Sequence, residues 1–372
     1  MIIFGIETSC DETACAILQK DKDRITILSN VVASSANLQS KYGGIIPEQA
    51  AREQIKAIIP VIEEALIQAF PNHKPYAINH KPPIDAIAVT YGPGLIGSLL
   101  VGVETAKILA KVWNKPLIPI NHLLGHFYAN WIETGKSNIV DGISGKNHKR
   151  LTINGKPKFP CLGLLVSGGH TDLVLFTDHG KYKYLGGTLD DAAGECFDKC
   201  ARLLGLPYPG GPQISKLAES GDSTKFKLPL PMKGKKSFDF SYSGLKAAVA
   251  RLVESEQFTS QRLGSPKAAV DSKADLAAAI EDMIVKTLVD KVVLAIQEYK
   301  VEEIIVAGGV AANQKLANRL QLAVDSLKSK IKLHVPHSSL CTDNGAMIAA
   351  AGFFSKKRIS PENLQANPNL SL

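Results

Sequence analysis

The sequence predicts an α/β protein with two domains, each built on a mixed β-sheet. Its 372 residues exceed what a single hydrophobic core usually holds. Residues 2–6 and 14–18 have the pattern of two short strands around a polar turn, and residues 161–166 and 172–176 repeat that plan. The repetition indicates an internal duplication, and strand patterns alternate with helical patterns along the rest of the chain.

The N-terminal half alternates strands and helices as far as a pair of histidines. A helix is expected over residues 47–70, because apolar side chains recur there at helical spacing. Residues 84–90 have the pattern of a strand, which a glycine-rich turn joins to a helix that ends near Trp113. A further strand over residues 117–120 leads directly into His122.

The C-terminal half continues the alternation. Its longest expected helix covers residues 274–299, where apolar side chains form a continuous stripe. A strand over residues 304–307 ends in two glycines and is followed by a helix. A last strand over residues 333–335 precedes a helix over residues 343–357.

These elements predict an N-terminal α/β domain over residues 1–133 and a C-terminal α/β domain over residues 159–358. Residues 134–158 are polar and have no periodicity, which predicts an inserted surface loop. Residues 359–372 are expected to form a flexible tail. Residues 220–236 carry five lysines among prolines and glycines, so we expect a flexible basic segment that can contact phosphates.

Composition limits the class of protein. Apolar residues make up 45% and charged residues 21%, which is typical of a globular protein and excludes a disordered one. A formal net charge of +8 favours a polyanionic partner such as nucleic acid, with an ordinary basic protein as the alternative. The chain begins without the basic region of a secretory signal, and the most apolar stretch, residues 95–113, carries three charges. We therefore expect a cytoplasmic protein without a membrane span.

Two histidines four residues apart form the first candidate site. On a helix, His122 and His126 share one face and can bind the same metal ion. A zinc protease of the His-Glu-x-x-His class needs glutamate directly after the first histidine, and Leu123 occupies that position. Asp343 lies where a loop enters a helix, and it either caps that helix or supplies a carboxylate ligand. Two imidazoles and a carboxylate suit iron or zinc.

Three glycine-rich turns suggest nucleotide binding. Residues 167–169 join two strands, residues 307–313 join a strand to a helix, and residues 208–212 form a third turn. Such turns expose backbone N–H groups that favour anionic groups, although glycine also serves ordinary tight turns. Residues 190–199 place three acids along one side of an expected helix, either as a solvated face or beside a cleft.

Ten segments together resemble one family, the tRNA N6-adenosine threonylcarbamoyltransferases, once labelled O-sialoglycoprotein endopeptidases. The segments occur in the family's order and span about residues 2–358. They are residues 5–13 (GIETSCDET), 42–48 (YGGIIPE), 92–95 (GPGL), 122–126 (HLLGH), 165–171 (LVSGGHT), 190–199 (DDAAGECFDK), 208–212 (YPGGP), 240–246 (FSYSGLK), 307–313 (AGGVAAN) and 341–345 (CTDNG).

The resemblance implies a fold like that of actin, sugar kinases and heat-shock ATPases, with a cleft between the duplicated domains. It places one divalent metal ion, Fe²⁺ or alternatively Zn²⁺, on His122, His126 and Asp343. It also implies substrate-binding positions at Leu165, Val166, Ser167, Gly168, Gly169, Asp198, Gly211 and Asn313. Leu124 and Ser215 depart from the family pattern, because many relatives have glutamate at the first position and some have an acidic ribose contact at the second.

The resemblance further implies a reaction and partners. The threonylcarbamoyl group passes from threonylcarbamoyl-AMP to N6 of adenosine 37 in tRNAs that read codons beginning with A, and AMP is released. Asp11 or Glu12 is the candidate to accept the amine proton, with a structural role in the turn as the alternative. The implied partners are a TsaB-like paralogue of the same fold and a small TsaE-like ATPase.

Three other functions remain open from the residues alone. A metallopeptidase is suggested by the histidine pair, although Leu123 argues against it. An ATPase or kinase of the same fold is suggested by the glycine turns. A non-enzymatic scaffold within a tRNA-modifying complex is the third, and the intact metal ligands argue against that.

Overall fold

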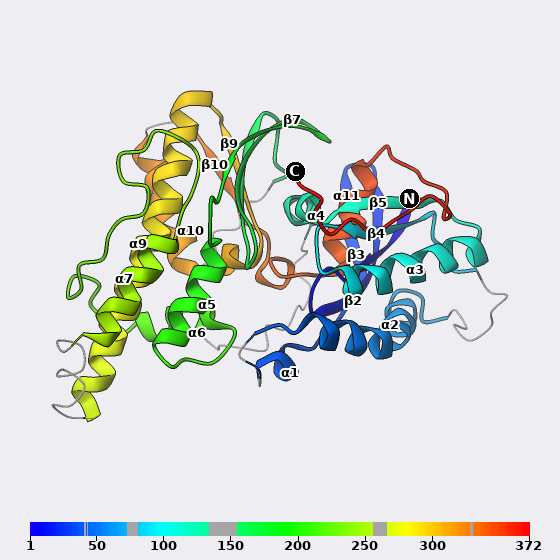
Figure 1. Cartoon of the computed structure of the whole chain (residues 1–372). Helices are drawn as coiled ribbons and strands as arrows, with labels where there is room; N and C mark the ends of the chain where they lie inside the picture. The colour runs from blue at the N-terminus through cyan, green and yellow to red at the C-terminus, as the bar shows by residue number, and fades with distance from the viewer. Residues whose placement is uncertain (41, 43, 73–80, 134–154, 256–265, 328–329) are drawn as a thin grey trace. The chain divides into compact units, whose positions relative to one another are not determined.

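A computed structural model of the chain describes residues 1–372 except 41, 43, 73–80, 134–154, 256–265 and 328–329, and it describes only the backbone of residues 266–270. The described residues form two compact units (Figure 1). Unit 1 comprises Met1–Asn37, Ile45–Pro157 and His334–Leu372, and unit 2 comprises Leu38–Gly44 and Lys158–Leu333. Each unit contains a mixed five-stranded sheet with helices, so the predicted α/β class is confirmed.

The sheet of unit 1 has the strand order β3-β2-β1-β4-β5. In this sheet β1 pairs antiparallel with β2 and parallel with β4. β3 extends the sheet beside β2, and β5 pairs parallel with β4. The strands are β1 (Ile2–Glu7), β2 (Glu12–Asp21), β3 (Arg24–Ser34), β4 (Ala86–Gly92) and β5 (Leu117–Asn121).

The sheet of unit 2 repeats this topology, with the order β8-β7-β6-β9-β10. Here β6 pairs antiparallel with β7 and parallel with β9, as β1 pairs with β2 and β4. The strands are β6 (Cys161–Val166), β7 (Thr171–Asp178), β8 (Lys181–Gly187), β9 (Glu303–Ala307) and β10 (Lys332–His334). The equal strand order, with matching antiparallel and parallel pairs around β1 and β6, confirms the predicted internal duplication.

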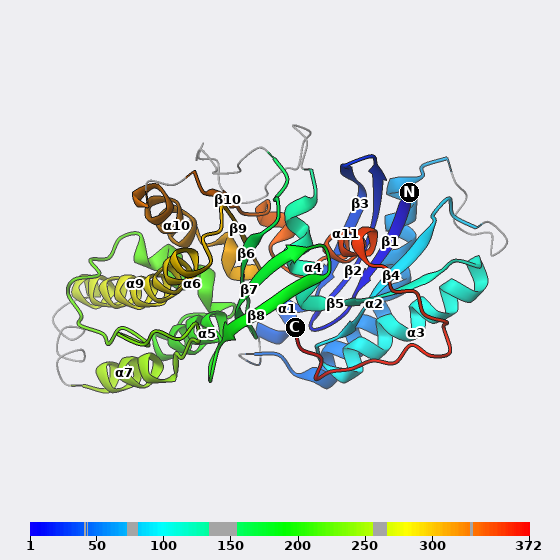
Figure 2. The ribbon, with the colours of Figure 1, turned by 90° about the horizontal axis from the view of Figure 1, so that it is seen from above.

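Helices cover both faces of the first sheet (Figures 1 and 2). On one face, α2 (Pro47–Ala69) contacts β2 and β3, and α3 (Ile96–Trp113) contacts β4. On the other face, α11 (Gly345–Phe354) contacts β1, β2 and β4. The short helix α4 (His122–Tyr128) follows β5 and also contacts α11. One core cluster, which includes Phe4, Ile6 and Val89, lies between the sheet and the helices α2 and α3. The buried residues of α11 cover the opposite face.

The C-terminal residues correct two sequence-based expectations. The predicted C-terminal domain ran to residue 358, but α11 belongs to unit 1, because eight of its ten residues are buried over the first sheet. Residues 359–372 were expected to be a flexible tail. Instead they pack on unit 1: Ile359 bridges to Leu117, the Asn367 amide donates to the Tyr91 carbonyl over 2.7 Å, and Leu364 is buried.

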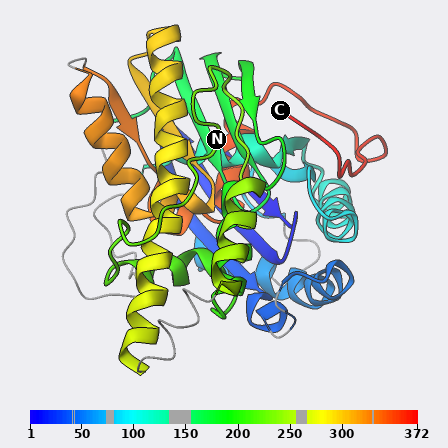
Figure 3. The same ribbon diagram turned by 60° about the vertical axis from the view of Figure 1, so that its left-hand side comes forward.

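In unit 2 the long helix α9 contacts α6 and α10, and α5 contacts α6 and α7. Figure 3 shows α9 in yellow with α10 in orange beside it. The helices are α5 (Ala193–Leu203), α6 (Gly210–Ala218), α7 (Ser243–Glu254), α9 (Pro266–Tyr299) and α10 (Gln314–Ser326). Short elements elsewhere are α1 (Ala36–Ser40), η1 (Ala129–Trp131), η2 (Gly309–Ala312) and η3 (Ser338–Leu340). The predicted loop over residues 134–158 lies mostly outside the described residues.

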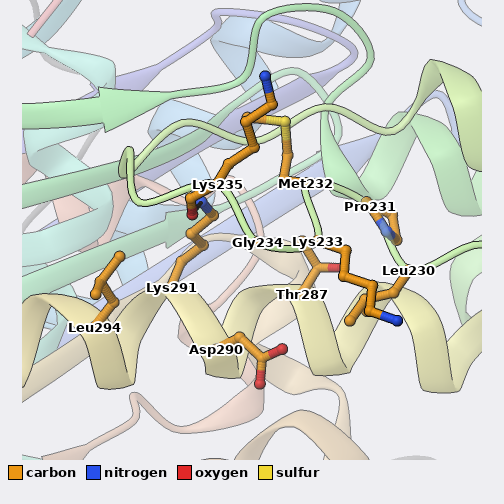
Figure 4. A pocket seen from close by; sticks show the side chains of 10 residues that line it. All are labelled: Leu230, Pro231, Met232, Lys233, Gly234, Lys235, Thr287, Asp290, Lys291 and Leu294. Atoms are coloured by element: carbon orange, nitrogen blue, oxygen red, sulfur yellow. Dashed lines mark hydrogen bonds between the residues drawn. The ribbon is translucent and has the colours of Figure 1, made fainter.

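The basic segment, residues 220–236, is anchored rather than free. The side chain of Phe226 is buried, and the ammonium of Lys291, itself 4% exposed, donates to the carbonyls of Lys235 and Ser237. Figure 4 shows Lys291 reaching from α9 to this loop, beside a cavity of about 250 Å³. The segment is a basic loop, as predicted. It was expected to be flexible, but the buried ammonium of Lys291 on α9 holds its end in place.

Among the described helices, none combines the length and the apolar character that crossing a bilayer requires.

Candidate functional site

The histidine pair lies on a short helix that a single asparagine positions. β5 ends at Asn121, whose side-chain oxygen accepts from the backbone N–H groups of Leu123 and Leu124 over 2.8 and 3.4 Å. This cap starts α4 at His122, so His122 and His126 face the same side one turn apart. Their ring centroids are 4.7 Å apart, and both side chains are buried.

Asp343 completes the cluster from the loop before α11. Its Oδ1 lies 3.2 Å from Nε2 of His126 and 3.6 Å from Nε2 of His122. The alternative that Asp343 caps α11 is wrong, because Asn344 is the cap and accepts from the Met347 N–H over 2.9 Å. The carboxylate of Asp343 is therefore left to face the imidazoles.

Glu7 is a member of this site that sequence reasoning missed. It is the last residue of β1 and is fully buried. Its carboxylate accepts from Nδ1 of His122 over 3.1 Å, from the Ser9 N–H over 2.5 Å and from the Thr90 hydroxyl. A carboxylate behind a ligating histidine fixes the tautomer and makes the other ring nitrogen a better ligand. Leu124 replaces the glutamate that many relatives have, but Glu7 still provides a supporting acid for His122. The only sequence signal for Glu7 was its place in the residue 5–13 motif.

The protonation of His122 and Asp343 depends on the charges of their neighbours in the cluster. Burial disfavours the charged form of His122, but the Glu7 and Asp343 carboxylates outweigh that effect and raise its pKa to about 9. Burial favours the neutral acid at Asp343, yet His122, His126 and Ser9 hold the pKa of this carboxyl well below its usual range. The site therefore strongly favours a positive charge close to the Asp343 carboxylate.

The donor set suits a divalent metal ion. Among the described residues, one nitrogen from each histidine and one oxygen of Asp343 lie within 4.8 Å of one another. Within the described part of the chain, neither ring nitrogen of the buried His126 has a hydrogen bond of ordinary geometry, although Nε2 approaches Asp343. Buried polar atoms in folded proteins nearly always have a partner, and a metal ion is one. Two imidazoles and one carboxylate with open positions are typical of catalytic iron and zinc sites.

Asp11 and Glu12, the candidate proton acceptors, lie in the same unit at the turn between β1 and β2. Asp11 is buried, and its carbonyl accepts from the Ser35 N–H and hydroxyl over 3.2 and 3.0 Å. Burial raises the pKa of Glu12 well above its usual value, and the nearby Asp343 and Asp11 carboxylates raise it further. Glu12 therefore holds a proton more readily than a solvent-exposed glutamate does.

In unit 2 the predicted substrate residues 165–169 cover the last two residues of β6 and the turn that follows it. The side chains of Leu165 and Val166 are fully buried, so only their backbone can contact a ligand. Ser167 closes the following turn, because its N–H donates to the His170 carbonyl over 2.8 Å. A Cβ added at Gly168 or Gly169 would meet no atom of the described residues within 4 Å, so those residues leave space over this turn.

Two further segments approach the same turn. Gly308 has φ +90°, and a Cβ there would lie 2.4 Å from the Val166 carbonyl oxygen, which only glycine avoids. Gly194 likewise sits against Ser167, whose carbonyl accepts from the Gly194 N–H over 3.2 Å. The β6–β7 turn, the start of α5 and the turn after β9 therefore converge at the carboxyl end of β6. Backbone N–H groups at such ends bind anionic groups.

The remaining substrate candidates are joined by hydrogen bonds. Asp198 accepts from the Gly210 N–H at the start of α6 over 2.7 Å, one residue before Gly211. Burial raises the pKa of Asp198, while the N–H groups of Gly210 and Gly211 oppose the rise. One turn further along α6, the Ser215 hydroxyl accepts from the Asn313 amide over 2.9 Å. The structure thus brings Asp198, Gly211 and Asn313 together through α6.

The acidic stretch 190–199 is internally paired rather than merely solvated. Asp190 accepts from the hydroxyls of Ser241 and Ser243 over 2.5 and 2.6 Å, and from the Tyr242 N–H over 2.7 Å. Lys199 pairs with both Asp191 and Glu195, at 2.6 and 2.8 Å. These contacts attach the residue 240–246 motif and α7 to α5.

Comparison with known proteins gives a consistent family match. Residues 26–155 and 147–350 match the family model described as TsaD: tRNA N6-adenosine threonylcarbamoyltransferase. A curated tRNA N6-adenosine threonylcarbamoyltransferase from Thermomicrobium roseum is 46% identical over 369 residues, which cover 96% of this chain and 93% of that protein. One from Geobacillus thermodenitrificans is 43% identical over 376 residues, which cover 100% of this chain and 96% of that protein.

Among solved structures, the crystal structure of T. kodakarensis HypF resembles the chain with a TM-score of 0.52 and 13% identity. The similarity covers 95% of this chain and 47% of HypF. At this identity it supports the fold alone, which is the predicted actin/sugar-kinase/heat-shock-ATPase-like fold.

Proposed function

The chain belongs to the tRNA N6-adenosine threonylcarbamoyltransferase family, and we propose that it moves the threonylcarbamoyl group from threonylcarbamoyl-AMP to N6 of adenosine 37 in tRNAs that read codons beginning with A. The full-length family match carries this proposal. Depleting the protein and analysing tRNA nucleosides tests it. Loss of threonylcarbamoyladenosine is the expected result, and an unchanged level of that nucleoside would contradict it.

We assign one divalent metal ion to His122, His126 and Asp343, with Fe²⁺ as the first candidate and Zn²⁺ as the alternative. A bound ion would act as a Lewis acid toward the carbamoyl carbonyl or the adenylate phosphate. Glu7 holds His122 with its Nε2 turned toward Asp343. His122, His126 and Glu7 are buried, so packing against the surrounding protein limits the orientations that their side chains can adopt.

The transfer forms one bond and breaks one. The N6 amine attacks the carbamoyl carbonyl carbon, the bond from that carbon to the AMP phosphate oxygen breaks, and the amine gives up a proton. Glu12 is the proposed acceptor with Asp11 beside it, because burial and the nearby carboxylates raise the pKa of Glu12, which makes its carboxylate a stronger base than an exposed one. In unit 2, the glycine turns at residues 167–169 and 308–309 would hold the AMP moiety through backbone N–H groups.

Glu7→Gln is expected to weaken metal binding about 10- to 100-fold, the usual effect of losing the acid behind a ligating histidine. Glutamine keeps the size of the side chain but lacks the charge that favours His122 as a Nδ1 donor. Titration of the metal-free protein with Zn²⁺ or Fe²⁺ measures the affinity. Glu303→Gln removes another buried acid, from unit 2, and should leave the affinity unchanged. Equal affinities for Glu7→Gln and wild type would show that Glu7 does not support the site.

The metallopeptidase alternative is not supported, since Leu123 occupies the position of the protease glutamate. An ATPase or kinase of this fold would hydrolyse ATP or transfer its phosphate without tRNA. A purified sample that turns over ATP without tRNA would favour that alternative.

We propose that a TsaB-like paralogue binds the outer face of α2 and α3, and that a TsaE-like ATPase completes the complex. On α2, the exposed side chains Ile55, Ile59 and Ile67 lie four or eight residues apart, in one row along the helix. On α3, a similar row is exposed, namely Ile96, Leu100, Ile108 and Val112. The helices pack against each other, so these exposed apolar side chains lie on neighbouring helices. Exposed apolar side chains grouped in this way are typical of protein interfaces.

Ile59→Glu combined with Ile108→Glu should weaken binding of the purified paralogue about 30-fold or more, because charges then replace apolar contacts at the centre of the surface. Sedimentation or calorimetric titration measures the affinity. Leu322→Glu is the matched control, since Leu322 is 68% exposed on α10 of unit 2. Equal affinity for the double variant and wild type would contradict the assignment of this surface.

We propose that the basic segment contacts tRNA phosphates. Five of its lysines are exposed, and within the described part of the chain none forms an ion pair shown by the structure; they are Lys225, Lys227, Lys233, Lys235 and Lys236. Because Lys291 anchors the backbone, these lysines have a defined position. Residues 149–150, also basic, lie outside the described residues, and the basic residues 356–358 follow α11.

Such a tRNA-modifying protein is expected to work in the cytoplasm.

Replacing Lys233, Lys235 and Lys236 with alanine should make tRNA binding less sensitive to salt. Each phosphate contact contributes about 0.7 to 0.9 to the slope of log affinity against log salt, so the slope should fall by about 2. A control that removes the same charge replaces Lys56, Lys181 and Lys332, which are paired with acids. Filter binding over a salt series measures both slopes, and an equal reduction in both variants would mean that net charge alone matters.

A further inference from the structure

The side chain of Asn313 is held on three sides within unit 2. Its Oδ1 accepts from the Leu316 N–H over 2.8 Å, which caps α10. Its Nδ2 donates to the Ser215 hydroxyl over 2.9 Å and to Oε1 of Glu281 over 2.8 Å. An amide nitrogen has two hydrogens, so these two acceptors use both of them.

Glu281 is the unexpected member of this group. It lies on α9 and is 5% exposed, and no sequence motif pointed to it. Its nearest cation, Lys315, is 3.7 Å from Oε2 and lies closer to the neighbouring acid Asp282, at 3.2 Å. The shortest bond of this buried carboxylate is therefore the one to the Asn313 amide. Burying a carboxylate is costly unless it makes strong hydrogen bonds, so this bond stabilises one orientation of the amide.

We propose that Glu281 is a positioning residue for the nucleotide, which acts by fixing Asn313 and, through it, the Ser215 hydroxyl. The proposal rests on the proposed function and on Asn313 being one of the substrate-binding positions that the family resemblance implies. A flipped amide would turn its oxygen toward Glu281, and two acceptors would then face each other. Glu281 thereby excludes the flipped state and keeps the Nδ2 hydrogens directed at Ser215.

The arrangement also accounts for serine at position 215. A hydroxyl that accepts one hydrogen bond still has its own hydrogen to donate. Ser215 is half-buried, so this hydrogen can reach a ligand at the start of α6. The chemical group that suits such a donor, beside the phosphate-binding turns, is a sugar hydroxyl of a nucleoside monophosphate. Glu281 does not touch the ligand itself; its carboxylate acts through Asn313 and Ser215.

The test compares AMP binding and transfer kinetics in variants of the full-length protein. Glu281→Ala should weaken AMP binding about tenfold and raise the KM for threonylcarbamoyl-AMP by the same factor, with kcat within about twofold, the pattern of lost ground-state binding. Glu281→Gln should stay within about threefold of wild type, because its amide oxygen accepts the same bond. Asp282→Asn is the matched control on α9 and should leave AMP affinity unchanged.

A polarity swap keeps the test decisive even where Glu281→Ala does not fold. Asn313→Asp still caps α10 but places a carboxylate against Glu281, so AMP binding should weaken about tenfold. Adding Glu281→Gln supplies an amide donor to that aspartate but none to Ser215, whose hydrogen is then taken by the carboxylate, so the stability in urea should recover while AMP affinity stays about tenfold weaker. Wild-type AMP affinity in Asn313→Asp, or losses in Asp282→Asn equal to those in Glu281→Ala, would overturn the proposal. A wild-type protein that binds AMP but transfers nothing would contradict the proposed function while leaving the Glu281 comparison valid, and one that does not bind AMP would overturn both.

Discussion

His126→Ala is expected to remove the metal ion from the protein and to reduce threonylcarbamoyl transfer on the order of a thousandfold or more. His126 is 2% exposed, and among the described residues neither of its ring nitrogens has a hydrogen bond of ordinary geometry, although Nε2 lies 3.2 Å from Asp343. This arrangement fits a metal ligand. A metal that polarises a carbonyl or phosphoryl oxygen contributes several kcal/mol to the transition state, and about 1.4 kcal/mol corresponds to a factor of ten in rate.

Elemental analysis of the purified variant should show well under one metal ion per chain, against one for the wild type. His122→Ala and Asp343→Ala should give the same result, because each removes one member of the same cluster. His179→Ala is the control, since His179 lies in the β7–β8 turn of unit 2. Undiminished metal content in the His126 variant would place the ion elsewhere.

The cluster of His122, His126 and Asp343 shows what sequence spacing can and cannot predict. The positions of His122 and His126 follow from the i, i+4 rule once α4 is assigned, so the pair was predictable from residues alone. Asp343 lies more than 200 residues away, and the residues alone left it as either a helix cap or a ligand until the family resemblance grouped it with the pair. Glu7 was missed because its role depends on β1 ending beside α4, and strand order is not a local property of the sequence.

The fold was predictable wherever local pattern decides it. Alternating patterns identified the strands that flank each polar turn, and the repeated plan predicted two sheets of equal topology. The assignment of α11 to unit 1 was not predictable, because an apolar helix packs equally well on either sheet as far as periodicity shows. The basic segment has loop composition, and its anchoring depends on Lys291 in a distant helix.

Glycines illustrate the same limit. The chain has 30 of them, and composition does not distinguish a flexible turn from a close backbone contact. At Gly345, the first residue of α11, an added Cβ would lie 2.5 Å from the Ala16 nitrogen and 2.7 Å from the Cys15 carbonyl carbon. At Gly5 in β1, an added Cβ would lie 2.3 Å from the Gly345 carbonyl oxygen. The helix therefore rests directly on the backbone of β1 and β2.

Gly345→Ala is expected to destabilise unit 1 by about 3 kcal/mol, at the upper end of the usual cost of overpacking, because the atoms that the new methyl meets are backbone and have little room to move. Shifting α11 also moves Asp343, two residues earlier, away from the histidines. The variant should therefore unfold at a lower urea concentration and also bind metal more weakly.

Equilibrium unfolding in urea and titration with Zn²⁺ measure the two effects. Gly244→Ala is the matched control: it adds the same methyl group within α7, where nothing lies within 4 Å of the new atom. Since alanine is favoured over glycine in a helix, this control should be neutral or more stable by up to about 1 kcal/mol. If the Gly345 variant unfolds at the wild-type urea concentration and retains its metal, then α11 can shift without cost, and the close contact with β1 and β2 does not set the position of Asp343.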